Sequence, residues 1–276
     1  MRIALYQART GLDPAANARD LTQAIRVAAA GGATTLFTPE MSGLLDRDRD
    51  RAAAHLRSEA ADPVLAAVRS AAAEAGIWVH LGSLALTGES ADGRLVNRGF
   101  LIDAAGQVRA RYDKIHLFDV DLPTGESWRE SAAYAPGTQP TVAETPAGRL
   151  GLSICYDLRF PDLYRTLSDF GATLLAVPAA FTVPTGQAHW HVLLRARAIE
   201  AGAFVIAAAQ CGRHEDGRAT YGHSLVVDPW GRVLLDMGGE EVGVGFADLD
   251  LAQVEEVRGR LPAIRHRRPI PAPLLS

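Results

Sequence analysis

The feature that most constrains this chain is an apolar strand pattern that leads directly into a cysteine. Leu150, Leu152 and Ile154 predict the strand, and Cys155 follows at once. Pro161 suits the first turn of a helix, because the N–H that proline lacks would be unpaired there anyway. We therefore expect Cys155 at a strand-to-helix elbow, near backbone N–H groups and the positive end of a helix dipole, a setting that favours the thiolate.

A cysteine taken alone is more often a small buried hydrophobic residue, and that alternative stays open for Cys155 at this point. The segment 156–161 that follows it is polar and carries an arginine. Because α/β folds place reactive groups in turns directly after buried strands, this segment favours a chemical role for Cys155.

The rest of the chain alternates between predicted strands and helices. Helices are expected over 13–31, 62–75 and 186–201 and after Pro161, with Asp13-Pro14 and Asp62-Pro63 as caps and Gly76 as a stop. Strands are expected over 3–8, 34–38, 77–86, 96–103, 108–112, 172–177, 203–209, 221–228, 233–236 and 242–249. The segment 119–139 is predicted to be a long irregular loop. This order indicates one α/β domain over 1–276, with a short C-terminal tail from about 262.

Composition narrows the class of protein. The 276 residues are 48% hydrophobic, enough for one large core, and the net charge of −4 argues against a nucleic-acid partner. The basic run 265–268 is short enough to be a surface tail. Neither a signal-peptide pattern nor a membrane-length apolar segment is apparent, and two cysteines do not make a disulfide framework. We expect a soluble cytoplasmic protein.

Three charged residues could assist a cysteine nucleophile. Cysteine-dependent hydrolysis of an amide or nitrile needs a base for the thiol proton, a cation for the developing oxyanion and a carboxylate that orients them. Glu40 comes two residues after the strand 34–38, Lys114 follows the strand 108–112, and Glu130 lies in the long loop. Each of these, taken alone, could equally be a solvated surface charge.

Taken together, these residues stand in motifs that resemble a known family. The segments 38–40 (Thr-Pro-Glu), 112–119 (Tyr-Asp-Lys-Ile-His-Leu-Phe-Asp) and 154–161 (Ile-Cys-Tyr-Asp-Leu-Arg-Phe-Pro) resemble the signature of the nitrilase superfamily of carbon–nitrogen hydrolases. The resemblance runs from Arg2 to about Arg268 and implies a four-layer α-β-β-α sandwich, commonly a homodimer.

The resemblance also implies a role for each site residue. Glu40 would be the general base, Lys114 the oxyanion stabiliser and Cys155 the nucleophile, while Glu130 matches a second glutamate beside the lysine. The Tyr156 backbone N–H would be a second oxyanion donor. On physical grounds we expect Lys114 to lower the pKa of the thiol and enclosure to raise that of Glu40.

The later half of the chain looks like one branch of this family. Segments 181–200, 207–214 and 221–224 resemble the deaminated glutathione amidase branch, in which Arg159, Phe181 and Thr185 would hold a 2-oxo-acid. Arg159 suits a carboxylate unaided, because guanidinium binds it bidentately. The resemblance implies hydrolysis of deaminated glutathione, a small-molecule amide, to 2-oxoglutarate and cysteinylglycine. The ω-amidase branch, acting on α-ketoglutaramate, is the alternative, although it usually lacks the segment 209–214.

The sequence allows three other interpretations. His189 and His191 could suggest a metal pair, but positions i and i+2 of a helix point about 200° apart, so we expect neither a metal nor a cofactor. His223 could serve Cys155 as a papain-like base. A catalytically inactive binding or scaffold protein of the same fold is the alternative of a different class.

Overall fold

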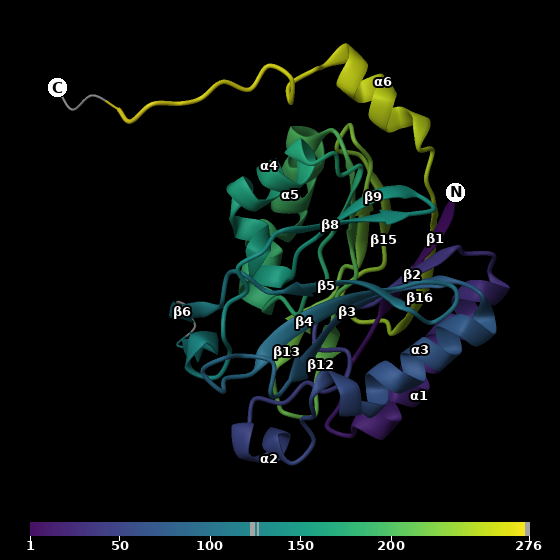
Figure 1. Ribbon diagram of the computed structural model, residues 1–276, viewed down its shortest axis with the longest axis vertical. Coiled ribbons are helices and arrows are strands. Elements are labelled where there is room, and N and C mark those ends of the chain that lie inside the picture. Colours follow the sequence, from purple (N-terminus) through teal and green to yellow (C-terminus); the bar gives the residue numbers. More distant parts are fainter. Residues whose placement is uncertain (122–124, 126, 274–276) are drawn as a thin grey trace.

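The computed structural model describes residues 1–121, 125 and 127–273, and it contains two six-stranded sheets stacked between helices (Figure 1). The first sheet has the order β16-β1-β2-β3-β4-β5, with β1, β2 and β3 parallel. Its strands are β1 (Arg2–Gln7), β2 (Thr35–Phe37), β3 (Trp78–Leu86), β4 (Val96–Ile102), β5 (Val108–Asp113) and β16 (Gly243–Asp248).

The second sheet repeats this plan with the order β15-β14-β11-β10-β9-β8, in which β9, β10 and β11 are parallel. Its strands are β8 (Thr141–Thr145), β9 (Gly148–Leu152), β10 (Leu174–Ala176), β11 (Phe204–Ala207), β14 (Leu225–Val227) and β15 (Val233–Asp236). Parallel strands deliver the segments after them to one edge of a sheet, so each sheet can present reactive groups there.

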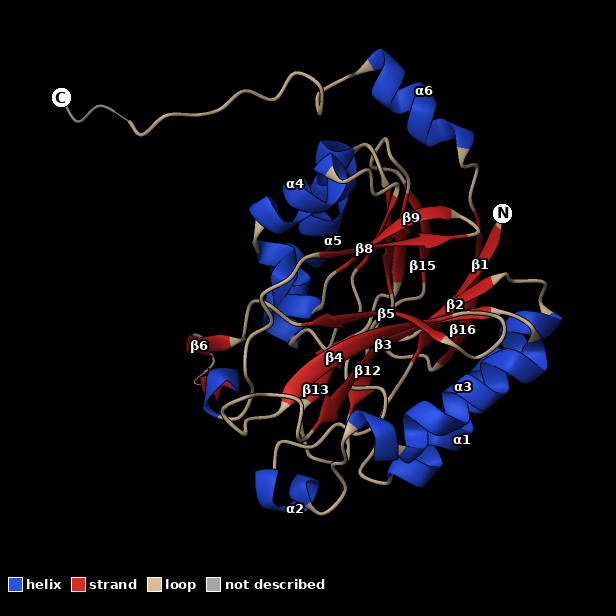
Figure 2. Cartoon of the chain, viewed as in Figure 1, coloured by secondary structure: helices blue, strands red, loops and turns tan. Residues whose placement is uncertain are grey.

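Helices cover the outer face of each sheet (Figure 2). The pair α1 (Pro14–Ala30) and α3 (Pro63–Ala75) packs on the first sheet, and α4 (Pro161–Asp169) and α5 (Val183–Ala201) pack on the second. The predicted α-β-β-α sandwich is confirmed.

The helix caps follow the sequence signals. Asp13 and Asp62 accept hydrogen bonds from the first turns of α1 and α3, at 2.9 and 2.8 Å. Gly76 ends α3 with a left-handed φ of 67°, which glycine adopts without steric cost.

β1 shows why the strands are apolar on both faces. Side chains alternate across a strand, so Ile3 and Leu5 enter one core while Ala4 and Tyr6 enter the other. The core with Ile3 also includes residues of α4, α5 and the second sheet, whereas the other is closed by α1 and α3.

The prediction that 119–139 is wholly irregular is wrong for the residues described there. β6 (Asp119–Asp121) and β7 (Ser127–Arg129) form an antiparallel pair, and η2 (Glu130–Ala132) follows as one 3₁₀ turn. Two hydrogen bonds from the Arg129 guanidinium to the Asp121 carboxylate, at 2.9 and 2.8 Å, join the two strands. Residues 122–124 and 126 of this segment lie outside the described part of the chain.

The elbow after β9 also differs from the prediction. Cys155 begins a 3₁₀ turn, η3 (Cys155–Arg159), and the α-helix starts only at Pro161. The Asp157 carboxylate stabilises this turn, because it accepts the Ile154 N–H at 2.9 Å and the Tyr112 hydroxyl at 2.7 Å.

Further differences concern short elements. Helix α5 starts at Val183 rather than near 186, and Tyr221 belongs to the small β12–β13 sheet rather than to the β14–β15 hairpin. Besides β6, β7, η2, η3 and β8, the elements that the sequence did not predict are α2 (Arg49–Ala53), η1 (Glu59–Ala61), β12 (Cys211–Arg213), β13 (Ala219–Tyr221) and α6 (Ala252–Arg260).

Residues 262–273, which follow α6, contain neither helix nor strand. Arg267 ties this segment to α4, because its guanidinium donates to Arg165 O at 3.2 Å and to Ser168 Oγ at 3.0 Å. Among the residues that the structure describes, no helix is both long and apolar enough to span a membrane.

Candidate active site

Four charged or nucleophilic side chains meet where the two sheets end. Glu40 follows β2, Lys114 follows β5, Cys155 follows β9, and Glu130 opens η2. Glu40, Lys114 and Cys155 are buried, with 4%, 2% and 8% of their surface exposed. The fold therefore places residues that are 115 positions apart in sequence in one enclosed site.

The Lys114 ammonium bridges the two glutamates. Its Nζ lies 2.8 Å from Glu40 Oε1 and 2.9 Å from Glu130 Oε2. Burial works to lower the pKa of Lys114, but the charges of Glu130 and Glu40 raise it well above its ordinary value. The lysine is therefore a fixed cation at neutral pH.

Glu40 is held by donors on both of its oxygens. Oε1 also accepts from Asn97 Nδ2 at 2.9 Å, and Oε2 accepts from the Ala180 N–H at 3.0 Å. Burial works to raise the pKa of Glu40, but the charge and hydrogen bond of Lys114, with hydrogen bonds from Cys155 and Asn97, lower it. Our expectation of a raised pKa is wrong, because these donors outweigh enclosure. Glu40 is a carboxylate that can accept a proton.

Cys155 has a left-handed φ of 49°, which is strained for a residue with a side chain. Its N–H donates to Pro178 O at 2.9 Å, which fixes the turn. Burial, followed by the charge of Glu40, raises the pKa of Cys155 well above its ordinary value, although Lys114 and the Ala180 N–H act in the opposite direction. The expected resting thiolate is therefore corrected to a thiol beside a carboxylate.

Two supporting residues were missed by sequence reasoning. Asn97 Nδ2 contacts both Glu40 and Glu130, the latter at 3.3 Å, from within β4. The Phe118 N–H donates to Glu130 Oε2 at 2.7 Å. Neither carries a sequence signal, because Asn97 stands in an ordinary strand pattern and Phe118 acts through its backbone.

A cavity of about 490 Å³ opens from this cluster. All eight predicted site residues line it: Glu40, Lys114, Glu130, Cys155, Tyr156, Arg159, Phe181 and Thr185. The Arg159 guanidinium carbon lies 5.8 Å from the centroid of the Tyr156 ring and 5.5 Å from that of Phe181. Within the part of the chain that is described, His223 is not among the lining residues, and it bonds to Asp236 instead.

The cavity also carries further cationic side chains. Besides Arg159, the arginines that line it are Arg47, Arg49, Arg94, Arg129 and Arg218. The Arg218 guanidinium lies over the Trp128 ring, 5.2 Å from its centroid. Arg94, Arg129 and Arg218 pair with Asp92, Asp121 and Asp216, at 2.6, 2.8 and 2.6 Å, so the charges of these three arginines are largely balanced within the protein.

A buried thiol, a carboxylate base and a fixed ammonium are the parts that a cysteine hydrolase needs to attack a carbonyl and stabilise the oxyanion. Residues 2–259 match the carbon–nitrogen hydrolase family, and the chain belongs to that family. It is accordingly a hydrolase of carbon–nitrogen bonds other than peptide bonds, as the sequence predicted.

Named relatives and solved structures agree with this assignment. A deaminated glutathione amidase from Yersinia enterocolitica is 38% identical over 96% of this chain and 92% of its own length. The C. elegans NitFhit protein superposes with a TM-score of 0.88 at 39% identity. The match covers 97% of this chain and 65% of the NitFhit chain.

A third comparison concerns the cysteine. A mutant of the amidase from Nesterenkonia sp. AN1 has a TM-score of 0.80 and 31% identity, over 97% of this chain and 94% of its own. That protein carries the acetamide moiety of fluoroacetamide covalently at its active-site cysteine.

Proposed function

We propose that this protein hydrolyses deaminated glutathione to 2-oxoglutarate and cysteinylglycine through a thioester on Cys155. The observation that carries the proposal is the burial of Cys155 and Glu40 in one cavity with Lys114, whose Nζ lies 2.8 Å from the Glu40 carboxylate. The name of the 38% identical relative supports the choice of substrate.

In the first half-reaction, the Glu40 carboxylate accepts the Cys155 thiol proton as the sulfur attacks the amide carbonyl. Lys114 and the Tyr156 N–H stabilise the oxyanion. Glu40 then returns the proton to the leaving nitrogen, the C–N bond breaks, and cysteinylglycine departs. In the second half-reaction, Glu40 takes a proton from water, the hydroxide attacks the thioester, and 2-oxoglutarate leaves as the thiol is restored.

Arg159 is assigned to the acyl half of the substrate. Its guanidinium is placed at the cavity wall by Tyr156 and Phe181, where it can pair with the carboxylate of the 2-oxo-acid end. Phe181 and Thr185, which line the same cavity, would contact the same 2-oxo-acid end of the substrate.

The leaving group requires room that a small amide would not use. Cysteinylglycine ends in a carboxylate, and Arg47 and Arg49 line the cavity where such a group could extend. An ω-amidase releases only ammonia from α-ketoglutaramate and needs no such extension.

A comparison of the two substrates tests this proposal. We expect a higher kcat/KM for deaminated glutathione than for α-ketoglutaramate, and Arg159→Ala should weaken both by a similar factor, because it touches the shared acyl half. A clear preference for α-ketoglutaramate would assign the chain to the ω-amidase branch.

The inactive scaffold alternative predicts no product from either substrate. It can be tested further with iodoacetamide, because Cys155 opens onto the cavity while Cys211 is fully buried. Labelling of Cys155 well ahead of Cys211 would favour the enzyme, and equal slow labelling would favour the scaffold.

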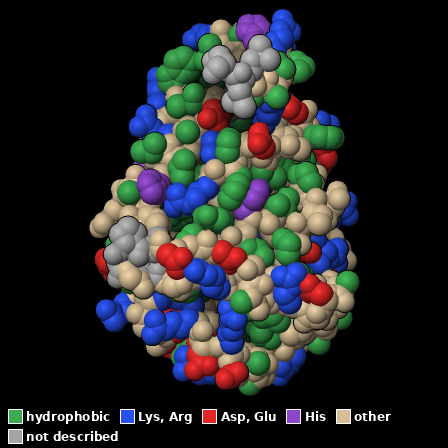
Figure 3. All heavy atoms as spheres, turned by 90° about the vertical axis from the view of Figure 1, so that its left-hand side faces the viewer, with side chains coloured by type: hydrophobic (Ala, Val, Ile, Leu, Met, Phe, Trp, Pro, Cys, Tyr) green, Lys and Arg blue, Asp and Glu red, His purple; other side chains and the backbone are tan. Residues whose placement is uncertain are grey.

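The proposal extends to assembly and location. Apolar side chains gather on the upper part of the face seen in Figure 3, and exposed ones on or beside the outer helices include Phe170, Val192 and Ile199, at 71%, 68% and 45% exposure. Burial of such residues against a second copy favours a homodimer. Light scattering that gives the mass of one chain at micromolar concentration would refute this.

A reducing cytoplasm suits a protein that uses a free thiol, and both cysteines are free. Figure 3 shows acidic and basic side chains interspersed on its lower half, and the net charge is −4. Both observations favour small-molecule substrates over nucleic-acid or membrane partners.

A further inference from the structure

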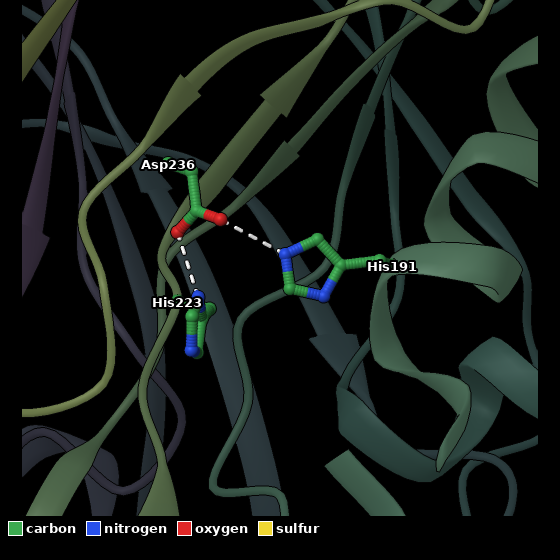
Figure 4. A group of neighbouring side chains, drawn as sticks. All are labelled: His191, His223 and Asp236. Carbon is green, nitrogen blue, oxygen red and sulfur yellow. Dashed lines mark hydrogen bonds and ion pairs between the residues drawn. The ribbon is translucent and has the colours of Figure 1, made fainter. Parts of the chain in front are cut away.

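A second cluster of titratable side chains lies outside the cavity. His191 of α5, Asp236 at the end of β15 and His223 between β13 and β14 point toward one another (Figure 4). His191 Nε2 lies 2.9 Å from Asp236 Oδ2, and His223 Nδ1 lies 2.8 Å from Asp236 Oδ1. The three ligand atoms all lie within 4.8 Å of one another.

The backbone fixes this cluster. His223 has a left-handed φ of 54°, its N–H donates to Gly238 O at 2.7 Å, and its carbonyl accepts from Trp190 Nε1 at 2.9 Å. The Gly238 N–H in turn donates to Asp236 Oδ1 at 3.0 Å. Non-glycine residues keep such a conformation only where their surroundings impose it, so His223 is held in place before any ligand binds.

None of the three residues is needed for the amide chemistry. Among the described residues that line the active-site cavity, His191, His223 and Asp236 do not occur. His189, two positions before His191 on α5, contacts Arg159 at 3.3 Å instead, so the two histidines have different partners, as helix geometry requires.

We propose that His191, His223 and Asp236 bind one divalent transition-metal ion such as Zn²⁺. Two imidazoles and one carboxylate are a donor set that Zn²⁺ accepts, with the remaining coordination position filled by water. At a tetrahedral Zn²⁺ site, ligand atoms about 2.1 Å from the ion are about 3.4 Å apart, so each imidazole nitrogen, now 2.9 or 2.8 Å from Asp236, would move by about 0.5 Å to admit the ion.

A bound ion would link α5 directly to β15. The proposal goes beyond the amidase function and does not depend on it.

Metal titration of the whole chain tests the proposal. Cys155→Ala is used as the background, so that the active-site sulfur cannot supply a ligand, and the protein is stripped with a chelator before Co²⁺ is added. We expect one Co²⁺ per chain, visible absorption bands of nitrogen and oxygen coordination without a thiolate charge-transfer band, and displacement by Zn²⁺. Zn²⁺ should also raise the thermal midpoint.

Substitutions then locate the site. His191→Ala and Asp236→Asn should each weaken Co²⁺ binding at least tenfold, and His223→Asn should do the same while tolerating the left-handed backbone. His189→Ala is the matched control on the same helix and should bind as the background does. Circular dichroism confirms that each variant is folded. Absence of Co²⁺ binding at millimolar metal, or binding that His191→Ala and Asp236→Asn leave unchanged, would overturn the proposal.

Discussion

Replacing Glu40 by glutamine keeps the shape of the side chain and removes its charge. In the native site Oε1 accepts from Lys114 and Asn97, and Oε2 accepts from the Ala180 N–H. An amide has one oxygen, so its NH₂ must face either the Ala180 N–H or the pair formed by Lys114 and Asn97. The first orientation keeps two of the three hydrogen bonds and is therefore preferred.

Glu40→Gln should have a small effect on stability and a large effect on the rate. A buried donor left facing another donor costs about 1–3 kcal/mol, a fraction of the roughly 5–15 kcal/mol that stabilises a typical domain. Lys114 also keeps its second partner, Glu130, at 2.9 Å. Glu40→Gln should therefore fold. Loss of a general base costs about 10²–10⁴-fold in rate, and here one residue serves both half-reactions.

The assay is amine release from deaminated glutathione, measured beside the thermal midpoint of the same preparation. Glu144→Gln is the matched control, because Glu144 is an exposed partner of Arg149 at 2.7 Å and should lose neither activity nor fold. A folded Glu40→Gln protein with kcat within tenfold of the wild type would refute the assignment of Glu40 as the general base.

Three further predictions concern the lysine, the strand beside the base and acid stability. Lys114→Ala should lower kcat by at least about 10²-fold. Lys114→Arg should restore little of this activity, because the planar guanidinium of arginine does not replace a compact ammonium. Steady-state kinetics that show near-full activity of Lys114→Arg would contradict this. Gly82→Ala should lower the thermal midpoint, since a Cβ there would lie 2.2 Å from Thr38 O, whereas Gly243→Ala in the same sheet meets nothing within 4 Å; equal midpoints would contradict the packing argument. Burial lowers the pKa of His80 from 6.5 to about 3, so on acidification the unfolded chain takes up a proton before the folded chain does. The free energy of unfolding should therefore fall as the pH drops below 6.5, by about 2 kcal/mol at pH 5. Urea unfolding of His80→Gln should show a smaller loss.

Much of the fold could be predicted because local signals agreed with the tertiary structure. The Asp-Pro caps and Gly76 bounded α1 and α3, and the apolar runs marked most of the strands. The candidate site could be predicted because Glu40, Lys114 and Cys155 stand in recognisable motifs and each follows a strand, β2 and β5 of the first sheet and β9 of the second.

The parts that sequence did not predict depend on contacts between distant segments. The 3₁₀ turn after Cys155 is stabilised by Asp157, which accepts from Tyr112, 45 positions earlier. The protonation of the site reflects two carboxylates around one buried ammonium, and the distances between these groups appear only in three dimensions. In the sequence the nearest histidine to His191 is His189, whereas its partners in space are Asp236 on β15 and His223 before β14.

The central claim is that Cys155 forms a thioester with the acyl half of the substrate. Intact-mass spectrometry of the protein quenched in acid during turnover of deaminated glutathione tests it most directly. The mechanism predicts a species heavier by one 2-oxoglutaryl group, mapped to the peptide that contains Cys155 and missing in Cys155→Ala, which should not turn over. Product release by Cys155→Ala, or an adduct on any other residue, would contradict the mechanism.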